Sequence, residues 1–100
     1  MVIITPNNTY FNNLIKNDFN IKKIFNYPFI IHKENNDNKK FIDLLLQNIN
    51  IYTKNLNIIA TINNEDTILR LVKANLGISI ISEKLANNYI KSKSILKFDI

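Results

Sequence analysis

Two polar loops and the end of one apolar run contain the side chains that are best suited to bind a small ligand. One loop is KENNDN, at 33–38, and the other is INNED, at 62–66. Each loop follows an apolar run and precedes a segment with helical periodicity, and free backbone N–H groups at a helix start favour anionic or polar groups. The predicted ligand contacts are Thr5, Glu34, Asn35, Asn36, Asn38, Asn63 and Asn64.

These residues also have structural interpretations. Asn36 or Asp37 would cap the helix that follows the first loop, because asparagine and aspartate are favoured at the N-cap. Asn63 would cap the next helix, with Asp66 at its third position, although Asn64 is an alternative cap. Both interpretations stay open at this point, for the loops as a whole and for each asparagine.

Catalysis and metal binding have little support in the sequence. There is no cysteine and only one histidine, His32, which has no acidic, cysteine or second histidine partner in its sequence context. A lone histidine of this kind is more often hydrogen-bonded or exposed than catalytic. The nucleophile, phosphate-binding and H-E-x-x-H motifs of enzymes are absent. We therefore expect a protein that is not an enzyme and has no metal or cofactor.

The composition predicts one globular domain over residues 1–100. The hydrophobic content is 46%, and 13 Lys and Arg residues against eight Asp and Glu residues give a net charge of +5. The lysines are scattered, with pairs only at 22–23 and 39–40, which favours a solvated surface over a nucleic-acid patch. No apolar run reaches the length of about 18 residues that a membrane span needs. The start, MVIITPNN, has no basic leader, so we expect a cytoplasmic protein without membrane contact.

Apolar runs alternate with helical patterns along the chain. The runs predict strands at 2–5, 29–32, 56–62, 78–81 and 95–100, and the periodicity predicts helices at 39–49, between Asn63 and Gly77, and at 82–90. A helical turn is predicted at 19–25, and 7–20 is otherwise predicted to be irregular. This alternation favours an α/β fold with a mostly parallel sheet of about five strands, flanked by helices.

Gly77 is the only glycine in the chain, where an average sequence would have about seven. It follows directly on a predicted helix. Because the residue after a helix end often has a positive φ, which glycine adopts without strain, we predict a positive φ at Gly77.

The helix predicted at 39–49 has more apolar positions than one core contact requires. One stripe contains Phe41, Leu44 and Leu45, and another contains Ile42, Leu46 and Ile49. A helix that packs against a single surface needs only one such stripe. We predict that one face covers the sheet and that the other contacts a partner subunit.

The segment NNEDTILRLVKANLGISIIS resembles the effector-binding region of LysR-type transcriptional regulators. In that family a helix ends in V-x-x-G-x-G-I and is followed by an apolar strand and usually a proline. The matching residues are Val72, Leu76, Gly77 and Ile78, while Asn75 replaces the first glycine and Ser82 the proline. Upstream, NYPFIIHKENNDNKKFIDLLLQN resembles the family's P-f-I…E-x-G-S segment, with Asn35 and Asn36 in the positions of the glycine and serine. VIITPNN and ILKFDI resemble the strands that open and close the second effector-binding subdomain.

This resemblance implies one lobe of a two-lobed, periplasmic-binding-protein-like (type II) fold. The DNA-binding domain and the first subdomain are absent from the chain, so DNA would be contacted only through an N-terminal domain that this sequence does not contain. A small-molecule effector would bind between the lobes, and a homodimer would form through helix 39–49 and strand 56–62. A solute-binding lobe of a transport-related protein and a freestanding dimerisation module are the alternatives.

Overall fold

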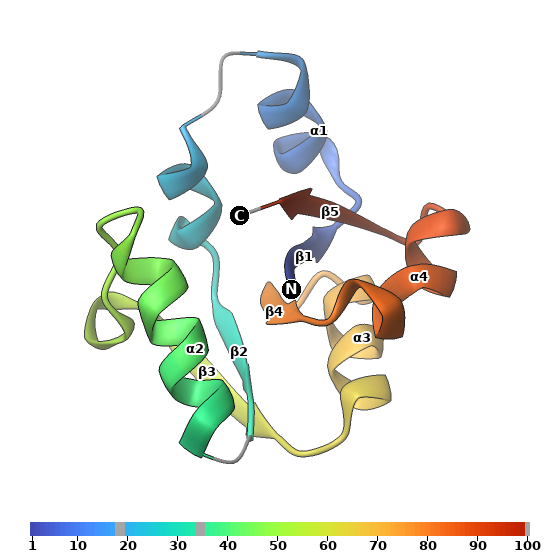
Figure 1. The fold of residues 1–100 in the computed structure, drawn as a ribbon. Coiled ribbons are helices and arrows are strands. Elements are labelled where there is room, and N and C mark those ends of the chain that lie inside the picture. The colour runs from blue at the N-terminus through green and yellow to red at the C-terminus, as the bar shows by residue number, and fades with distance from the viewer. Residues whose placement is uncertain (18–19, 34–35, 100) are drawn as a thin grey trace.

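The computed structural model describes residues 1–17, 20–33 and 36–99. Strands and helices alternate along the chain (Figure 1). Their order is β1 (Val2–Pro6), α1 (Thr9–Lys16), the 3₁₀ helix η1 (Ile21–Asn26), β2 (Phe29–His32), α2 (Asn36–Gln47), the 3₁₀ turn η2 (Thr53–Asn55), β3 (Ile58–Ile62), α3 (Glu65–Lys73), β4 (Ser79–Ile81), α4 (Glu83–Lys91) and β5 (Ile95–Asp99).

The strands form two small sheets. β4, β1 and β5 form an antiparallel sheet with β1 in the centre, and β2 and β3 form a parallel pair. The α/β class is therefore confirmed, but the expected single, mostly parallel sheet of about five strands is not. β1 runs against both of its neighbours, a direction that the alternation of strands and helices along the sequence does not specify.

A short junction between β2 and β4 links the two sheets. The backbone N–H of Ile30 donates to the Ile78 carbonyl at 2.8 Å, and the N–H of Ile78 donates to the Pro28 carbonyl at 2.9 Å. The buried hydroxyl of Ser79 adds a bond to the Ile30 carbonyl at 2.7 Å. The Ser79 side chain therefore adds a third hydrogen bond between the two sheets, beyond the two backbone bonds.

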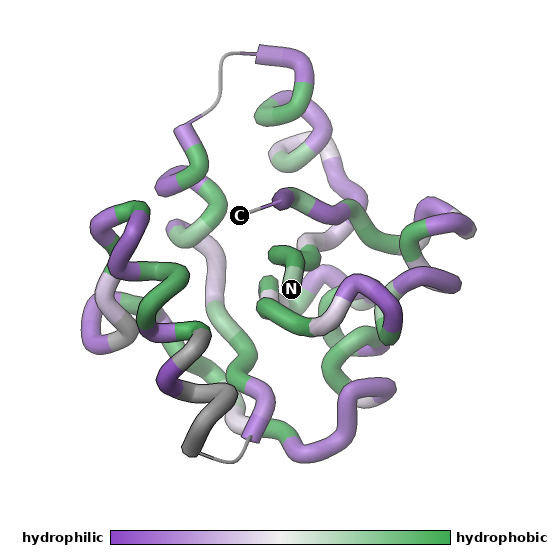
Figure 2. Tube along the Cα trace, in the orientation of Figure 1, coloured by the Kyte–Doolittle hydropathy of each residue, from purple (hydrophilic) through white to green (hydrophobic). Residues whose placement is uncertain are grey.

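Two hydrophobic clusters fill the interior, and β1 contributes to both. Ile3 belongs to a cluster with Phe11 and Phe98, whereas Ile4 belongs to a cluster with Ile68 and others from α3 and α4. Successive side chains of a strand point to opposite faces, so β1 is buried on both sides. In Figure 2 the strands in the middle of the molecule are largely in the hydrophobic colour, whereas the helices around them alternate between the hydrophobic and hydrophilic colours.

The prediction that 7–20 is irregular was wrong, because α1 occupies Thr9–Lys16. The side chain of Asn8 caps this helix by accepting a bond from the Phe11 N–H at 3.0 Å. Phe11 and Leu14 are the residues that α1 buries. The helical turn predicted at 19–25 is η1, a 3₁₀ helix.

The boundaries of two other elements also differ from the prediction. The helix predicted at 39–49 is α2, which begins at Asn36 and ends at Gln47. The strand predicted at 56–62 begins only at Ile58. Ser82 is the N-cap of α4, as predicted, although its side chain makes no capping hydrogen bond.

The prediction of a positive φ at Gly77 was wrong, because Asn75 takes the left-handed position with φ of 68°. The N–H of Asn75 donates to the Val72 carbonyl at 3.0 Å, and the N–H of Leu76 donates to the Leu71 carbonyl at 3.1 Å. These two bonds form a Schellman motif, which satisfies carbonyls at the helix end. Asparagine tolerates this conformation better than most residues.

Gly77 is required by the junction between the sheets. A Cβ atom at this position would lie 2.9 Å from the Pro28 carbonyl oxygen and 3.3 Å from side-chain carbons of Ile30. The first separation is shorter than real Cβ contacts. The lone glycine therefore allows the backbone of the α3–β4 connection to approach β2 closely.

Candidate functional site

The ends of β2 and β3 lie side by side and form one edge of the molecule. His32 is paired with Ile62 in the parallel register, and the Lys33 N–H donates to the Ile62 carbonyl at 2.7 Å. Figure 1 shows the starts of α2 and α3 at this same end. In α/β folds, ligands bind outside the carboxyl ends of such strands. We call this edge, represented by His32, Asn63, Asn64 and Glu65, the candidate site.

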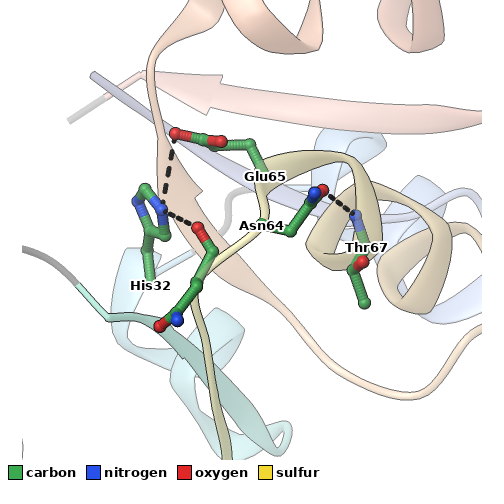
Figure 3. Close-up of polar contacts among 5 residues, drawn as sticks. His32, Asn64, Glu65 and Thr67 are labelled. Atoms are coloured by element: carbon green, nitrogen blue, oxygen red, sulfur yellow. Dashed lines mark hydrogen bonds and ion pairs between the residues drawn. The ribbon is translucent and has the colours of Figure 1, made fainter.

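His32 connects the end of β2 to the loop that follows β3. Its Nε2 lies 2.8 Å from the carbonyl oxygen of Asn63 and 3.4 Å from Oε1 of Glu65 (Figure 3). A carbonyl oxygen can only accept a hydrogen bond, so Nε2 carries the proton. The His32 side chain is only 11% exposed, which leaves it better placed to orient the loop than to take part in proton transfer.

Asn64 is the N-cap of α3. Its Oδ1 accepts from the Thr67 N–H at 3.1 Å, and its φ of −97° lies in the extended region. The interpretation of Asn63 as the cap was therefore wrong, and Asp66 is at the second helical position. Asn63 offers its backbone carbonyl to His32, while the residue itself is exposed.

The electrostatics of the candidate site disfavour a strongly anionic ligand next to α3. Glu65 and Asp66 occupy the first turn of the helix, where they offset the positive end of the helix dipole. Asp66 is paired with Arg70 at 2.9 Å, whereas the Glu65 carboxylate lies towards His32. Together with the exposed Asn63, this arrangement suits hydroxyl or ammonium groups, which a carboxylate and an amide bind well.

The other predicted contacts lie in several places. Asn36 and Asn38 are in the first turn of α2, and Glu34 and Asn35 lie outside the described residues. Thr5 is 0% exposed and its hydroxyl donates to the Pro6 carbonyl at 3.2 Å. Because β1 is antiparallel to its neighbours, the end of β1 that contains Thr5 is remote from the candidate site.

Sequence reasoning missed the role of Glu65 beside His32. The signal was present: His32 is the last residue of β2 and Glu65 follows the end of β3 closely, so parallel pairing of β2 and β3 brings the two residues to the same edge. The sequence predicted that His32 is a surface or hydrogen-bonded residue, and its ring is hydrogen-bonded to the Asn63 carbonyl.

Within residues 1–17, 20–33 and 36–99, no group of three or more histidine, cysteine, aspartate or glutamate residues is arranged to hold a metal ion. No helix in the same ranges is long and apolar enough to cross a membrane.

Comparisons with known proteins support the resemblance through structure alone. No family model and no curated protein matches the sequence. Among solved structures, the effector-binding domain of QuiR in complex with shikimate matches 99% of this chain, with a TM-score of 0.67 and 21% identity. The cofactor-binding domain of the Cbl transcriptional regulator matches 98%, with a TM-score of 0.70 and 15% identity.

The chain spans less than half of each matched structure, 44% of QuiR and 40% of Cbl. Nearly the whole of this chain therefore corresponds to one part of each of these two larger structures. The resemblance to the effector-binding domains of LysR-type regulators, first identified from sequence motifs, is thus confirmed at the level of the fold.

Proposed function

We propose that the chain is an effector-sensing lobe of a cytoplasmic, LysR-type transcriptional regulator and has no catalytic activity. The observation that supports this most is the match of 99% of the chain to part of an effector-binding domain. The match agrees with the candidate site, where two strand ends and two helix starts meet. A ligand in a cleft between this lobe and a second lobe would contact that edge.

The class of effector follows from the charges at the candidate site. Glu65 and the amide of Asn63 favour a ligand with hydroxyl or ammonium groups, and backbone N–H groups at a helix start such as that of α2 favour a carboxylate. QuiR binds shikimate, a small molecule with both hydroxyl and carboxylate groups. Shikimate is therefore a suitable first probe, together with a zwitterionic amino acid such as serine.

The effector proposal is tested by titrating the ¹⁵N-labelled chain with shikimate and with serine while its amide resonances are recorded. We expect saturable shifts at Asn63, Asn64 and Glu65, and weaker binding in Asn63→Ala. Thr61→Ala is the matched control, because Thr61 is exposed on β3 before the strand ends. If the same resonances do not move with any polar metabolite in a broad panel, the sensing role is contradicted.

The regulator proposal is tested by the coding DNA that flanks the sequence. A continuous reading frame that encodes a helix-turn-helix and a first α/β lobe would support it. A signal sequence upstream would favour the transport-related alternative. A stop codon shortly upstream of Met1, together with a ribosome-binding site for Met1, would contradict the regulator proposal. It would favour a freestanding dimerisation module.

We further propose that α2 and β3 form the contact with a partner subunit. Leu44 on α2 is 60% exposed, and Ile58 and Ile59 on β3 are 40% and 50% exposed. β3 pairs with β2 alone among the described strands, which leaves its other edge available. Exposed apolar side chains on an open edge are typical of interaction surfaces.

The subunit contact is tested by sedimentation at concentrations from micromolar to millimolar. We expect the chain to dimerise and Ile59→Lys to shift it to monomer. Leu85→Lys is the matched control, since Leu85 is 51% exposed on α4, away from the proposed surface. Equal effects of the two substitutions would contradict a contact through β3.

A further inference from the structure

A second site lies at the opposite end of the three-stranded sheet from the candidate site. A hollow of about 430 Å³ opens between α1, the end of α4 and the start of β5. In Figure 1, β5 starts beside the end of α4 and runs below α1. The register places Pro6 against Ile95 at this end and Val2 against Asp99 at the other. The hollow is therefore separate from the candidate site.

The wall of the hollow is apolar on several sides. Its lining residues are Asn7, Asn12, Ile15, Ile90, Lys93, Ile95, Leu96 and Lys97. Ile15 is 52% exposed although it lies on the amphipathic helix α1. Apolar walls with a few placed polar groups are typical of small-molecule sites, and the volume lies within their usual range of about 300–1,000 Å³.

The polar end of the hollow is fixed by backbone geometry. Lys93 has φ of 61° and ends α4 with a Schellman motif, in which its N–H donates to the Ile90 carbonyl at 3.0 Å and the Ser94 N–H donates to the Tyr89 carbonyl at 3.0 Å. The side-chain amide of Asn7 donates to the Lys93 carbonyl at 2.7 Å. These bonds hold the connection between β1 and α1 against the loop that leads from α4 into β5.

The charge at this end is positive. Lys97 donates to Glu83 at 3.1 Å and is thereby neutralised. The ammonium group of Lys93, in contrast, has no hydrogen bond or ion pair among the residues that the structure describes. No acidic residue lines the described hollow. One available cation beside an apolar wall is complementary to a ligand with one negative charge and an aliphatic part.

We propose that the hollow binds a small amphipathic carboxylate of the fatty-acid class. The aliphatic chain lies against Ile15, Ile90 and Leu96, and the carboxylate lies at Lys93. This site is independent of the effector proposed for the edge at His32. It therefore gives the lobe two distinct places at which a metabolite binds.

The test is a titration of the ¹⁵N-labelled chain with octanoate below the concentration at which it forms micelles. We expect saturable shifts at Asn7, Asn12, Ile15 and Lys93, including the side-chain amides of the two asparagines, and no shifts at Asn63 or Asn64. Acetate and 1-octanol are the ligand controls. They lack the chain and the charge respectively, and both are expected to bind more weakly than octanoate.

Two variants with matched controls separate the apolar and the charged contributions. Ile15→Asn is expected to weaken octanoate binding about tenfold, whereas Leu85→Asn, at a similarly exposed position, leaves it unchanged. Lys93→Asn keeps a residue suited to the left-handed conformation and removes the charge, so it is expected to weaken binding about threefold to fivefold. Lys84→Asn, on α4 but not in the hollow, is its control.

Several outcomes would overturn the proposal. They are the absence of saturable octanoate shifts, equal affinity for 1-octanol, and shifts distributed over the exposed apolar residues of α2, β3 and α4. Saturable shifts that are confined to the hollow, with an affinity that Ile15→Asn lowers about tenfold, would support it. Far-UV circular dichroism of each variant confirms that the fold is intact before its binding is compared.

Discussion

Two strands of similar composition have opposite environments in this fold. β1 is VIITP and is buried along its whole length, whereas β3 is IIATI and exposes Ile58 and Ile59 by 40% and 50%. β1 has a strand on each side, while β3 pairs with β2 alone among the strands that the structure describes. The position in the sheet, rather than the residue types, therefore decides which strand is core and which is available to a partner.

The largest expected effect is on stability, in a direct comparison of the two strands. Ile4→Ala in β1, where Ile4 is 0% exposed, should lower the free energy of unfolding by about 3 kcal/mol. Ile59→Ala in β3 should change it by less than about 0.5 kcal/mol. Urea unfolding of the two variants at a concentration where the chain is monomeric measures both values. Equal losses would mean that β3 is as much part of the core as β1.

The junction between the two sheets is tested by Gly77→Ala. Replacing a glycine that lacks a positive φ is usually neutral or stabilising, because it restricts the unfolded chain. Here the added Cβ would lie 2.9 Å from the Pro28 carbonyl oxygen, so the backbone must shift. We expect a loss of about 2 kcal/mol, again by urea unfolding. A stabilised variant would show that the junction is loose and the two sheets are less tightly joined.

A smaller effect is expected at Asn75, next to the same junction. Asn75→Ala should destabilise the chain by about 1 kcal/mol, since alanine is strained at a φ of 68°. Asn75→Gly relieves the strain but also removes the 2.8 Å bond from the Asn8 amide to Asn75 Oδ1. If thermal unfolding shows both variants equally destabilised, the hydrogen bond rather than the backbone conformation is what Asn75 contributes.

The smallest effect is expected at β5, one of the two edge strands of the three-stranded sheet. The hydrogen bond and charge of Glu83 raise the pKa of Lys97 above its ordinary value of 10.5. The contribution to stability is therefore fully present below pH 10.5 and is lost as the pH rises through the raised pKa. Lys97→Gln should make the stability of the chain less dependent on pH in this alkaline range. An unchanged pH profile would mean that the ion pair contributes nothing measurable.

The sequence predicted the elements that have strong local patterns. The apolar runs at β1, β2 and β4 and the helical periodicity of α3 and α4 are local, and they were identified. α1 was missed because its asparagines and short length conceal the spacing of Phe11 and Leu14. Strand direction was missed because pairing depends on contacts between residues far apart in the chain.

The candidate site was predictable only in part for the same reason. The two asparagine-rich loops were identified from their positions after strands, but local sequence does not distinguish Asn63 from Asn64 as the cap. The reason for Gly77 was not visible either, since it depends on the Pro28 carbonyl of another strand. Asn75, in contrast, could be recognised as the residue in the place of the family's first glycine.

The central position of β1 also has a consequence for the order of folding. Its strand partners, β4 and β5, are the last two strands of the chain. During synthesis at about 5 to 20 residues per second, β1 remains unpaired for several seconds, while β2 and β3 can already pair. The apolar segment VIIT is exposed throughout that time, so the yield of folded chain in the cell should depend on chaperones that hold nascent apolar segments.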